Sequence, residues 1–596
     1  FVIGDPAFAG INFSFPLGST RKITGTIDID SAATGVNRIL YLDTISPTFS
    51  FGSLHRTSEF HYQAKNKTST TATFGKLFID VDTLTVNSSP TVQTSLTVSG
   101  GATLATTRAG TFCKMIMQSG STDTIYGNVN IQNSAGLSCG KCTPTSIGAV
   151  LNFVDATPNI IFGPNSIAQY AKSSTQNIQP LSYQNMEVTG GATKNVDITG
   201  GNSMYATIAN QLTVSAGTTL SIPNENLVLK SDSTKTAMLT QCYGTISGKV
   251  IVERFLRTKK AWRLLSSPTK HDAQTIKQSW MEGGSSNSNP NPGYGIQITN
   301  NAASWQTDGF DAYSNSPSVK YLDTSNNWVG ISNTNSAFDT GKAYMTFVRG
   351  NRSVTAFGQA PTSTVLREKG TLRIGTITYS SLGPSTGNKF VAIGNPYASA
   401  VNIVDVIFLN SANLDKVYYL WDPLLSGTNG LGGYQTISIR NNGTINSIVP
   451  GSGSFAGGVA NLESGQGFIV HTIAGASGSI TFNETNKLDS SRLVARPPKP
   501  YPSIRVNLLK MQGAENVLTD GVINLYDSSA TDLIDPNDAL KLYNPSENIA
   551  IKTNDKYFAI ENRNSLKFND TIFYQLSNLK AADYSLEITP ESINSF

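Results

Sequence analysis

Residues 84–86 read LTV, and the same three letters return at 96–98 and 212–214. Similar apolar–polar–apolar units fill the stretch from Phe78 to Leu229, and turn-forming pairs such as Gly-Gly or Asn-Ser separate many of them. The further units are Val129-Asn130-Ile131, Leu151-Asn152-Phe153, Val196-Asp197-Ile198, Leu220-Ser221-Ile222 and Leu227-Val228-Leu229. Alternation with a period of two between turns is typical of β-strands. Strands at this short spacing predict stacked rungs, namely a right-handed parallel β-helix over residues 76–250. Because the spacing is irregular, a β-sandwich stays open.

The rest of the chain is also expected to be β-structure, since helix formers never dominate a long window. At 596 residues the chain is too long to fold around a single hydrophobic core. One helical candidate runs from His271 to Glu282, with Ile276, Ser279 and Trp280 on one side. The predicted order is an N-terminal β cap (1–75), the β-helix (76–250), a jelly-roll or β-sandwich domain (251–495) and an Ig-like antiparallel β-sandwich (503–596). The proline-rich segment 496–502 is expected to link the last two.

Charge and hydropathy exclude several classes of protein. Only 14% of the residues are charged, against about 25% in an ordinary soluble domain. The net charge is +4 and no basic block occurs, whereas a nucleic-acid-binding protein would need a basic stripe. No run of apolar residues is long enough for a membrane span. Since Phe1 cannot be a translational start, we expect a mature or trimmed product.

The sequence offers little material for catalysis. The carboxylates of the repeat region mostly occur singly; Asp80 and Asp82 share one face of a strand and are expected to be solvated. The chain has four histidines, and none accompanies a nucleophile motif. His55, Glu59 and His61 could ligate a metal together only on a suitable turn. No phosphate-binding or dinucleotide-binding loop is present. We therefore predict that the protein is not an enzyme and has no catalytic or cofactor-binding residues.

Two cysteines have C-x-x-C spacing, Cys139 and Cys142. This spacing serves thioredoxin-like chemistry, half of a zinc site, or a local disulfide. The redox alternative needs a helix N-terminus, and the surroundings indicate strands and turns. A zinc site would have to recruit Cys113 and Cys242. A loop disulfide or buried thiols are the simplest interpretation.

A cluster of hard oxygen ligands lies near the C-terminus, and carboxylates of this kind on one loop are what calcium prefers. Its members are Asp527, Asp532, Asp535, Asn537 and Asp538. The sequence therefore predicts a structural calcium site. Ordinary turn chemistry, with side chains bonding their own backbone, is the alternative. The cluster lacks the central glycine and distal glutamate of an EF-hand.

From about Val250 onward, the chain resembles surface and secreted proteins that the Bacteroidota export through the type IX secretion system. The matching segments are 252–255 (VERF), 261–269 (AWRLLSSPT), 341–345 (GKAYM), 394–399 (GNPYAS), 419–423 (YLWDP), 465–470 (GQGFIV) and 535–551 (DPNDALKLYNPSENIAI). The resemblance implies a bacterial cell-surface or extracellular location and a sorting domain beyond Phe596. Its implied partners are the type IX translocon and outer-membrane shuttle or attachment proteins, with surface glycans as further candidates.

The same resemblance implies O-glycosylation, because these bacteria attach glycans at Asp-Ser or Asp-Thr followed by a small or aliphatic residue. The candidate hydroxyls are Ser31, Thr44, Thr83, Thr124, Ser233 and Thr571. A glycan requires an exposed hydroxyl, so any residue buried within a rung is excluded.

The sequence thus predicts a non-enzymatic secreted or cell-surface protein exported by the type IX system. Adhesion or surface attachment is the expected role, as in biofilm formation or gliding motility, because stacked rungs present a long rigid face. One alternative is a carbohydrate-active enzyme with a β-helical catalytic domain. A second alternative is a secretion cargo protein bound to its translocon.

Overall fold

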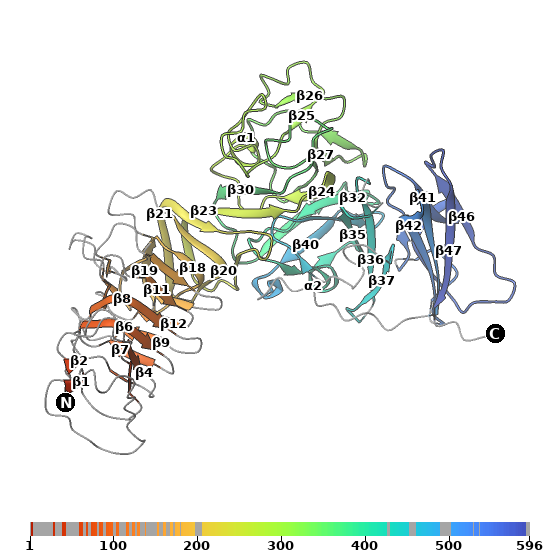
Figure 1. The fold of residues 1–596 in the computed structure, drawn as a ribbon. Coiled ribbons are helices and arrows are strands. Elements are labelled where there is room, and N and C mark those ends of the chain that lie inside the picture. Colours follow the sequence, from red (N-terminus) through yellow and green to blue (C-terminus); the bar gives the residue numbers. More distant parts are fainter. Residues whose placement is uncertain are drawn as a thin grey trace. The chain divides into compact units, whose positions relative to one another are not determined.

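The computed structural model describes residues 205–591 apart from 426–429, 441, 452–460, 489–501, 529 and 536. It also describes 173–178, 180–196 and a series of short strands before them. The chain divides into two compact units, which are described separately (Figure 1). The first comprises Phe1–Ser231 and Lys235–Ile251, and the second comprises Asp232–Thr234 and Val252–Phe596. The predicted linker 496–502 lies outside the described residues except for Pro502.

The first unit is built from parallel strands. One sheet has the order β13-β10-β8-β6-β4-β3, and β11, β14 and β15 also pair into it. Its strands are β3 (Ile39–Leu42), β4 (Glu59–Tyr62), β6 (Thr73–Ile79), β8 (Thr91–Val98), β10 (Met115–Met117), β11 (Thr122–Ile125), β13 (Leu137–Ser138), β14 (Asn152–Phe153) and β15 (Asn159–Phe162). A separate parallel pair is formed by β1 (Val2–Ile3) and β2 (Asp28–Ile29).

A second sheet of this unit has the order β17-β19-β21-β20-β18-β16-β12-β9-β7-β5, with β22 beside β20. Its strands are β5 (Lys67–Thr68), β7 (Thr83–Val86), β9 (Thr103–Thr106), β12 (Asn128–Ile131), β16 (Ile167–Tyr170), β17 (Gln176–Ile178), β18 (Ser182–Val188), β19 (Ala192–Val196), β20 (Ala206–Val214), β21 (Thr218–Leu229) and β22 (Met238–Leu239). The next strand, β23 (Thr245–Leu256), runs across the boundary between the units in sequence.

Successive strands stack in register, so that apolar residues follow one another from strand to strand. One column of partners reads Leu42, Tyr62, Ile79, Val98, Ile125, Phe162. Another reads Leu104, Val129, Ala168, Met186, Leu212, Leu239. Where side chains are described, members of these columns such as Ile79 and Met186 are buried. The all-β prediction is confirmed, and Val214 and Leu227 are buried as expected.

The second unit begins with an antiparallel sheet of the order β24-β29-β27-β28. Its strands are β24 (Ala261–Ser266), β27 (Val319–Leu322), β28 (Trp328–Gly330) and β29 (Ala343–Val348). Nearby lie β25 (Thr299–Asn300), β26 (Ala312–Tyr313), β30 (Thr364–Gly370) and α1 (Ile276–Ser279). The predicted helix from His271 to Glu282 is therefore wrong in length. It begins only after Thr275, whose side chain forms a capping box with Gln278, and His271 has a left-handed φ of 53°.

A five-stranded antiparallel sheet forms the centre of this unit, with the order β32-β39-β35-β36-β37. Its strands are β32 (Phe390–Gly394), β35 (Leu414–Asp422), β36 (Gly433–Ile439), β37 (Ile445–Val449) and β39 (Gly467–Thr472). Both faces are buried, since Tyr418 and Leu420 join one hydrophobic cluster while Val417, Tyr419 and Trp421 join another. Around it lie β31 (Ile377–Leu382), β33 (Val401–Asn402), β34 (Ser411–Ala412), β38 (Asn461–Leu462), β40 (Gly478–Phe482), α2 (Ile403–Leu409) and the 3-10 turn η2 (Glu484–Asn486).

The C-terminal part is a β-sandwich with the strand order β46-β44-β45-β42-β41-β47 (Figure 1). Its strands are β41 (Ser503–Gln512), β42 (Glu515–Tyr526), β43 (Ala539–Leu540), β44 (Asn548–Thr553), β45 (Lys556–Arg563), β46 (Phe573–Ser577) and β47 (Tyr584–Glu591). It has its own small core around Val506, Ile549 and Phe558. Ile523 and Ile560 instead share a hydrophobic cluster with residues of the central sheet. The boundary predicted between 495 and 503 thus separates segments that pack on each other, and the four-domain division stays a prediction.

Candidate functional site

A groove with a volume of about 690 Å³ opens on the second unit. Its wall comprises β27 and the turn after it, residues 340–343, β31 with the turn after it, and the beginning of β32. Antiparallel pairing of β27 with β29 places Tyr321 opposite Tyr344, and pairing of β32 with β39 places Phe390 opposite His471. The groove therefore collects side chains that are far apart in the sequence.

Three half-buried aromatic rings line this groove: Tyr321, Tyr379 and Phe390. Phe390 is held edge-on to Tyr419, with ring centroids 5.4 Å apart. The ring of Tyr379 lies across Gly341, where a Cβ atom would come within 2.6 Å of it. Gly341 also has a φ of 75°, so both the space and the backbone at this position require glycine.

The Tyr379 hydroxyl is buried and has no hydrogen-bond partner among the residues that the structure describes. Burial also raises the pKa of this phenol, so it stays protonated near neutral pH. Because this hydroxyl is closed to solvent, Tyr379 contributes its ring to the groove and not a polar anchor.

The remaining lining of the groove combines aliphatic side chains with polar ones, most of which are uncharged. Thr324, Thr340, Thr378, Ser380 and Ser381 contribute exposed hydroxyl groups. The ammonium group of Lys342 pairs with Asp339 at 2.8 Å and lies 5.3 Å from the centre of the Tyr321 ring. The carboxylate of Asp323 accepts hydrogen bonds from the N–H groups of Ser325 (2.9 Å) and Asn327 (2.8 Å). Rings beside hydroxyls suit the binding of an uncharged hydroxyl-rich ligand, since such sites combine apolar surface with a few placed polar groups.

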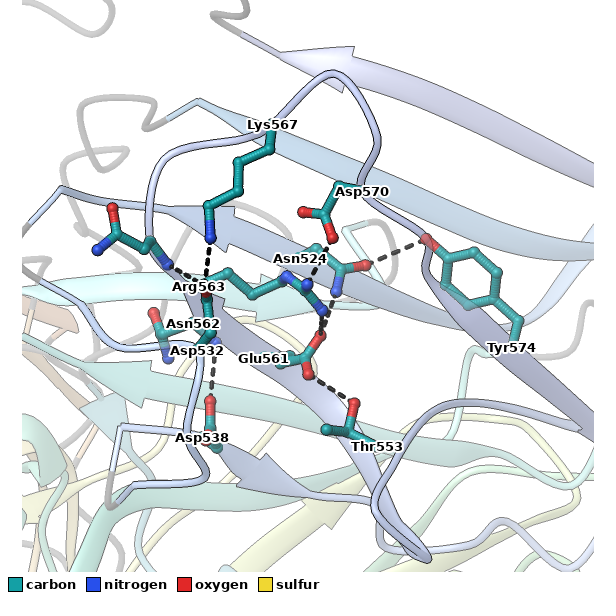
Figure 2. A network of polar contacts seen from close by, with 11 residues as sticks. Asn524, Asp532, Asp538, Thr553, Glu561, Asn562, Arg563, Lys567, Asp570 and Tyr574 are labelled. Carbon is teal, nitrogen blue, oxygen red and sulfur yellow. Dashed lines mark hydrogen bonds and ion pairs between the residues drawn. The ribbon is translucent and has the colours of Figure 1, made fainter.

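Two of the predicted calcium ligands, Asp532 and Asp538, belong to a polar network of the C-terminal sandwich (Figure 2). Asp532 accepts bonds from Lys567 Nζ (2.8 Å) and the Asn564 N–H (3.1 Å), and the bond from Lys567 lowers the pKa of this carboxyl. Asp538 accepts bonds from the N–H groups of Asp535 (2.9 Å) and Asn562 (2.8 Å). Burial raises the pKa of Asp538 to about 6.

The other members of the cluster bond to the backbone as well. Asp535 accepts from the Asn537 N–H at 2.7 Å, and the Asp527 N–H donates to the Arg563 carbonyl at 3.0 Å. Within the described residues, no three His, Cys, Asp or Glu side chains lie together so that they could hold a metal ion. The contacts among Asp535, Asn537 and Asp538 are the turn chemistry of the alternative interpretation, whereas Asn562, Arg563 and Lys567 belong to another segment. Calcium binding stays a prediction.

Arg563 is the centre of the polar network beside this loop (Figure 2). Its guanidinium donates to Asp570 at 2.7 Å and to Glu561 at 3.4 Å. Glu561 also accepts from Asn524 (2.7 Å) and Thr553 (2.6 Å). The network connects strands β42, β44 and β45 with the loop that follows β45, so its role is structural.

Two of the predicted glycan acceptors are exposed, Ser233 and Thr571. Thr83 and Thr124 lie on β7 and β11, but their side chains are outside the described residues, as are Ser31 and Thr44 altogether. Cys139 and Cys142 also lie outside the described residues, together with Cys113. Cys242 is buried, and its thiol donates to the Gly244 carbonyl at 3.6 Å. Glycosylation and the disulfide both stay predictions.

Four of the seven segments that carry the type IX resemblance meet at two tight contacts. A Cβ atom on Gly394 would lie 2.3 Å from that of Ser266, and one on Gly467 would lie 2.4 Å from that of Ala343. Asn395, which is fully buried, donates to the Ser399 carbonyl at 2.8 Å and the Leu462 carbonyl at 3.0 Å. These residues serve packing between β24, β29, β32 and β39.

Residues 165–593 match the family model described as a domain of unknown function, DUF8693. No curated protein and no solved structure matches the chain. In the part of the chain that the structure describes, no helix is long and apolar enough to cross a membrane. The groove residues Tyr321, Tyr379 and Phe390 were missed by sequence reasoning, because each is an isolated aromatic residue on a different strand.

Proposed function

Since the chain belongs to the DUF8693 family, whose function is unknown, we propose its role from its own geometry. We propose that it is a non-enzymatic secreted or cell-surface protein that attaches to glycan surfaces through the groove. The observation that supports this proposal is the groove itself, in which the rings of Tyr321, Tyr379 and Phe390 and several exposed threonine and serine side chains line one cavity. Aromatic rings offer apolar contact area at low conformational cost, while hydroxyl groups supply directional bonds to a sugar.

We further infer that residues 76–250 form a right-handed parallel β-helix that acts as a rigid stalk. The parallel register of the two main sheets and their apolar columns support this. Connections between parallel strands of one sheet are right-handed in about 98% of cases, which supports the handedness. An experimental structure with left-handed connections in this region would refute the inference.

Export by the type IX system to the cell surface belongs to the same proposal, with the translocon and outer-membrane attachment proteins as partners. Support comes from the ordered motifs, four of which converge on the contact between Gly394, Gly467 and their neighbours. Protease treatment of intact cells of the native host tests it. Digestion of the protein without cell lysis is expected, and full protection combined with a cytoplasmic fraction would contradict it.

Binding is tested with the full chain on an array of polysaccharides and oligosaccharides. Tyr321→Ala should weaken the binding of any glycan that is retained by about tenfold, as expected for loss of roughly 1.4 kcal/mol of ring contact. Thr378→Val, which removes one hydroxyl of the groove and keeps the shape of the side chain, should also weaken binding. Tyr313→Ala is the matched control, because Tyr313 is 55% exposed and lies outside the groove. Equal binding by all four proteins, or none by the unaltered chain, would refute the groove as the attachment site.

A further inference from the structure

A second surface of this unit carries aromatic rings that are covered by cations, and we call it the cation–aromatic row. Trp262 on β24 lies directly opposite Phe347 on β29, with ring centroids 5.2 Å apart. Phe357, from the segment after β29, stacks on Phe347 with centroids 6.5 Å apart and an interplanar angle of 14°. The three rings form a continuous row that ends at Phe357, which is 69% exposed.

One cation lies against each ring of this row. Lys320 Nζ is 4.9 Å from the centre of the Trp262 ring, and Arg349 Cζ is 5.4 Å from that of Phe347. Lys260 Nζ is 5.2 Å from the centre of the Phe357 ring and also donates to the Phe357 carbonyl. Ring faces attract cations through their quadrupoles, so the rings fix where these charges lie.

These positive charges are poorly compensated. Among the described residues, no carboxylate forms an ion pair with Lys260, Lys320 or Arg349. By contrast, Asp311 is bound bidentately by Arg352. Arg349 Nη1 is buried and has no hydrogen-bond partner within the described part of the chain. Burial lowers the pKa of both Lys320 and Arg349, which indicates partly desolvated cations, and for Arg349 the negative charge of Asp311 offsets this effect only in part.

We propose that the cation–aromatic row binds an anionic polysaccharide through its carboxylate or sulfate groups. Several fixed cations side by side match a polymer whose anionic groups repeat along the chain. Single-stranded nucleic acid fits less well, because base stacking needs several open ring faces. Here Phe347 is only 8% exposed, and a cation lies over each ring. The site is separate from the groove and does not depend on the proposal made for it.

The test measures binding of the full chain to immobilised alginate and dextran sulfate, with neutral dextran and a single-stranded oligonucleotide beside them. The double variant Lys320→Gln/Arg349→Gln should bind the two polyanions about tenfold more weakly at low salt, and added salt should weaken binding by the unaltered chain. The control Lys270→Gln/Lys556→Gln removes the same charge from two exposed lysines outside the row and should change the Kd by less than about twofold.

Tryptophan fluorescence confirms folding of both variants, since all five tryptophans of the chain lie in this unit. Loss of binding in the row variant, with an unchanged unfolding midpoint and no binding to neutral dextran, supports the site. The proposal is overturned if the unaltered chain does not bind either polyanion, if both double variants bind equally, or if the oligonucleotide is bound and the polyanions are not.

Discussion

The buried carboxyl group of Glu368 should make the stability of the second unit depend on pH. Alternation along β30 directs Glu368 into the interior, where it is 3% exposed. Trp280 Nε1 donates to one carboxyl oxygen at 2.6 Å, and the Ser267 hydroxyl donates to the other. Arg373 lies near but donates to the carbonyls of Ser267 and Thr269. Burial outweighs these bonds and raises the pKa of Glu368 from 4.5 to about 7.

The size of this pH dependence follows from the pKa shift of Glu368. One pKa unit is worth about 1.4 kcal/mol, so Glu368 favours its protonated form in the folded state by roughly 3 kcal/mol. Below pH 4.5 the carboxyl is protonated in both states and its contribution is fully present. Between the unfolded pKa of 4.5 and the folded pKa of about 7, the unfolded chain loses this proton while the folded chain keeps it. The free energy of unfolding therefore falls as pH rises through this window.

His271 acts in the opposite direction. Its Nδ1 accepts the Phe338 N–H at 3.2 Å and its Nε2 lies 3.0 Å from the Ser279 hydroxyl, an arrangement that suits the neutral ring. Burial lowers the pKa of His271 from 6.5 to about 4. Its contribution is present above pH 6.5 and is lost as pH falls toward 4, by an amount similar to that of Glu368. In the unaltered chain, Glu368 and His271 change the free energy of unfolding with pH in opposite directions, and these changes largely cancel between pH 4.5 and 6.5.

Glu368→Gln separates the two effects, since glutamine has nearly the shape of the protonated acid. We expect the variant to match the unaltered chain at pH 4.5 and to be more stable by roughly 3 kcal/mol at pH 8. Urea unfolding followed by tryptophan fluorescence measures the difference at each pH, and contributions common to both proteins cancel. Glu515→Gln, at an exposed position, should show no such trend. A constant difference between Glu368→Gln and the unaltered chain over this range would refute the reasoning.

Three further predictions concern packing, charge and modification. Arg352→Met should lower the free energy of unfolding by about 3–5 kcal/mol in urea titrations, because it leaves the fully buried Asp311 carboxylate without its partner. Gly467→Ala should cost about 1–3 kcal/mol by overpacking, whereas Gly358→Ala should be close to neutral, since nothing lies within 4 Å of a Cβ there. Intact-mass measurement on protein from the native host should reveal glycans that Thr571→Ala reduces, and an unmodified mass would contradict the prediction.

The strands could be predicted wherever one local pattern determined them. Apolar residues that alternate between turns, as in the LTV units, can bury only one face and therefore form strands. The run KVYYLW at 416–421 carries a different signal, because the strand β35 is covered on both faces and needs no polar alternation. Sequence alone could not tell which cluster each face would join, since that depends on pairing with β36 and β39.

The helices show the limits of propensity. The segment IVDVIFL at 403–409 looks like a strand because β-branched residues dominate it, yet it forms α2. Its signal is at the N-terminus, where the Asn402 side chain accepts from the N–H groups of Val404 (3.1 Å) and Asp405 (3.3 Å). Four buried apolar side chains then fix the helix against the central core. Tertiary packing with a good cap overrode the intrinsic preference of the segment.

Candidate sites differ in how far the sequence can reveal them. The cluster from Asp527 to Asp538 is local and could be found at once, yet its oxygens bond to backbone N–H groups and to Lys567. The groove is assembled from strands that are paired over long sequence separations, so no window of sequence contains it. Gly341 is the one residue of the groove that the sequence could indicate, because its positive φ and the adjacent Tyr379 ring exclude any side chain at this position. Gly341 also belongs to segment 341–345 of the type IX resemblance. It therefore connects a sequence motif to the wall of the groove. If related chains keep residues 341–345 for packing, they should also keep this part of the groove wall. The rings that contact a ligand remain free to vary.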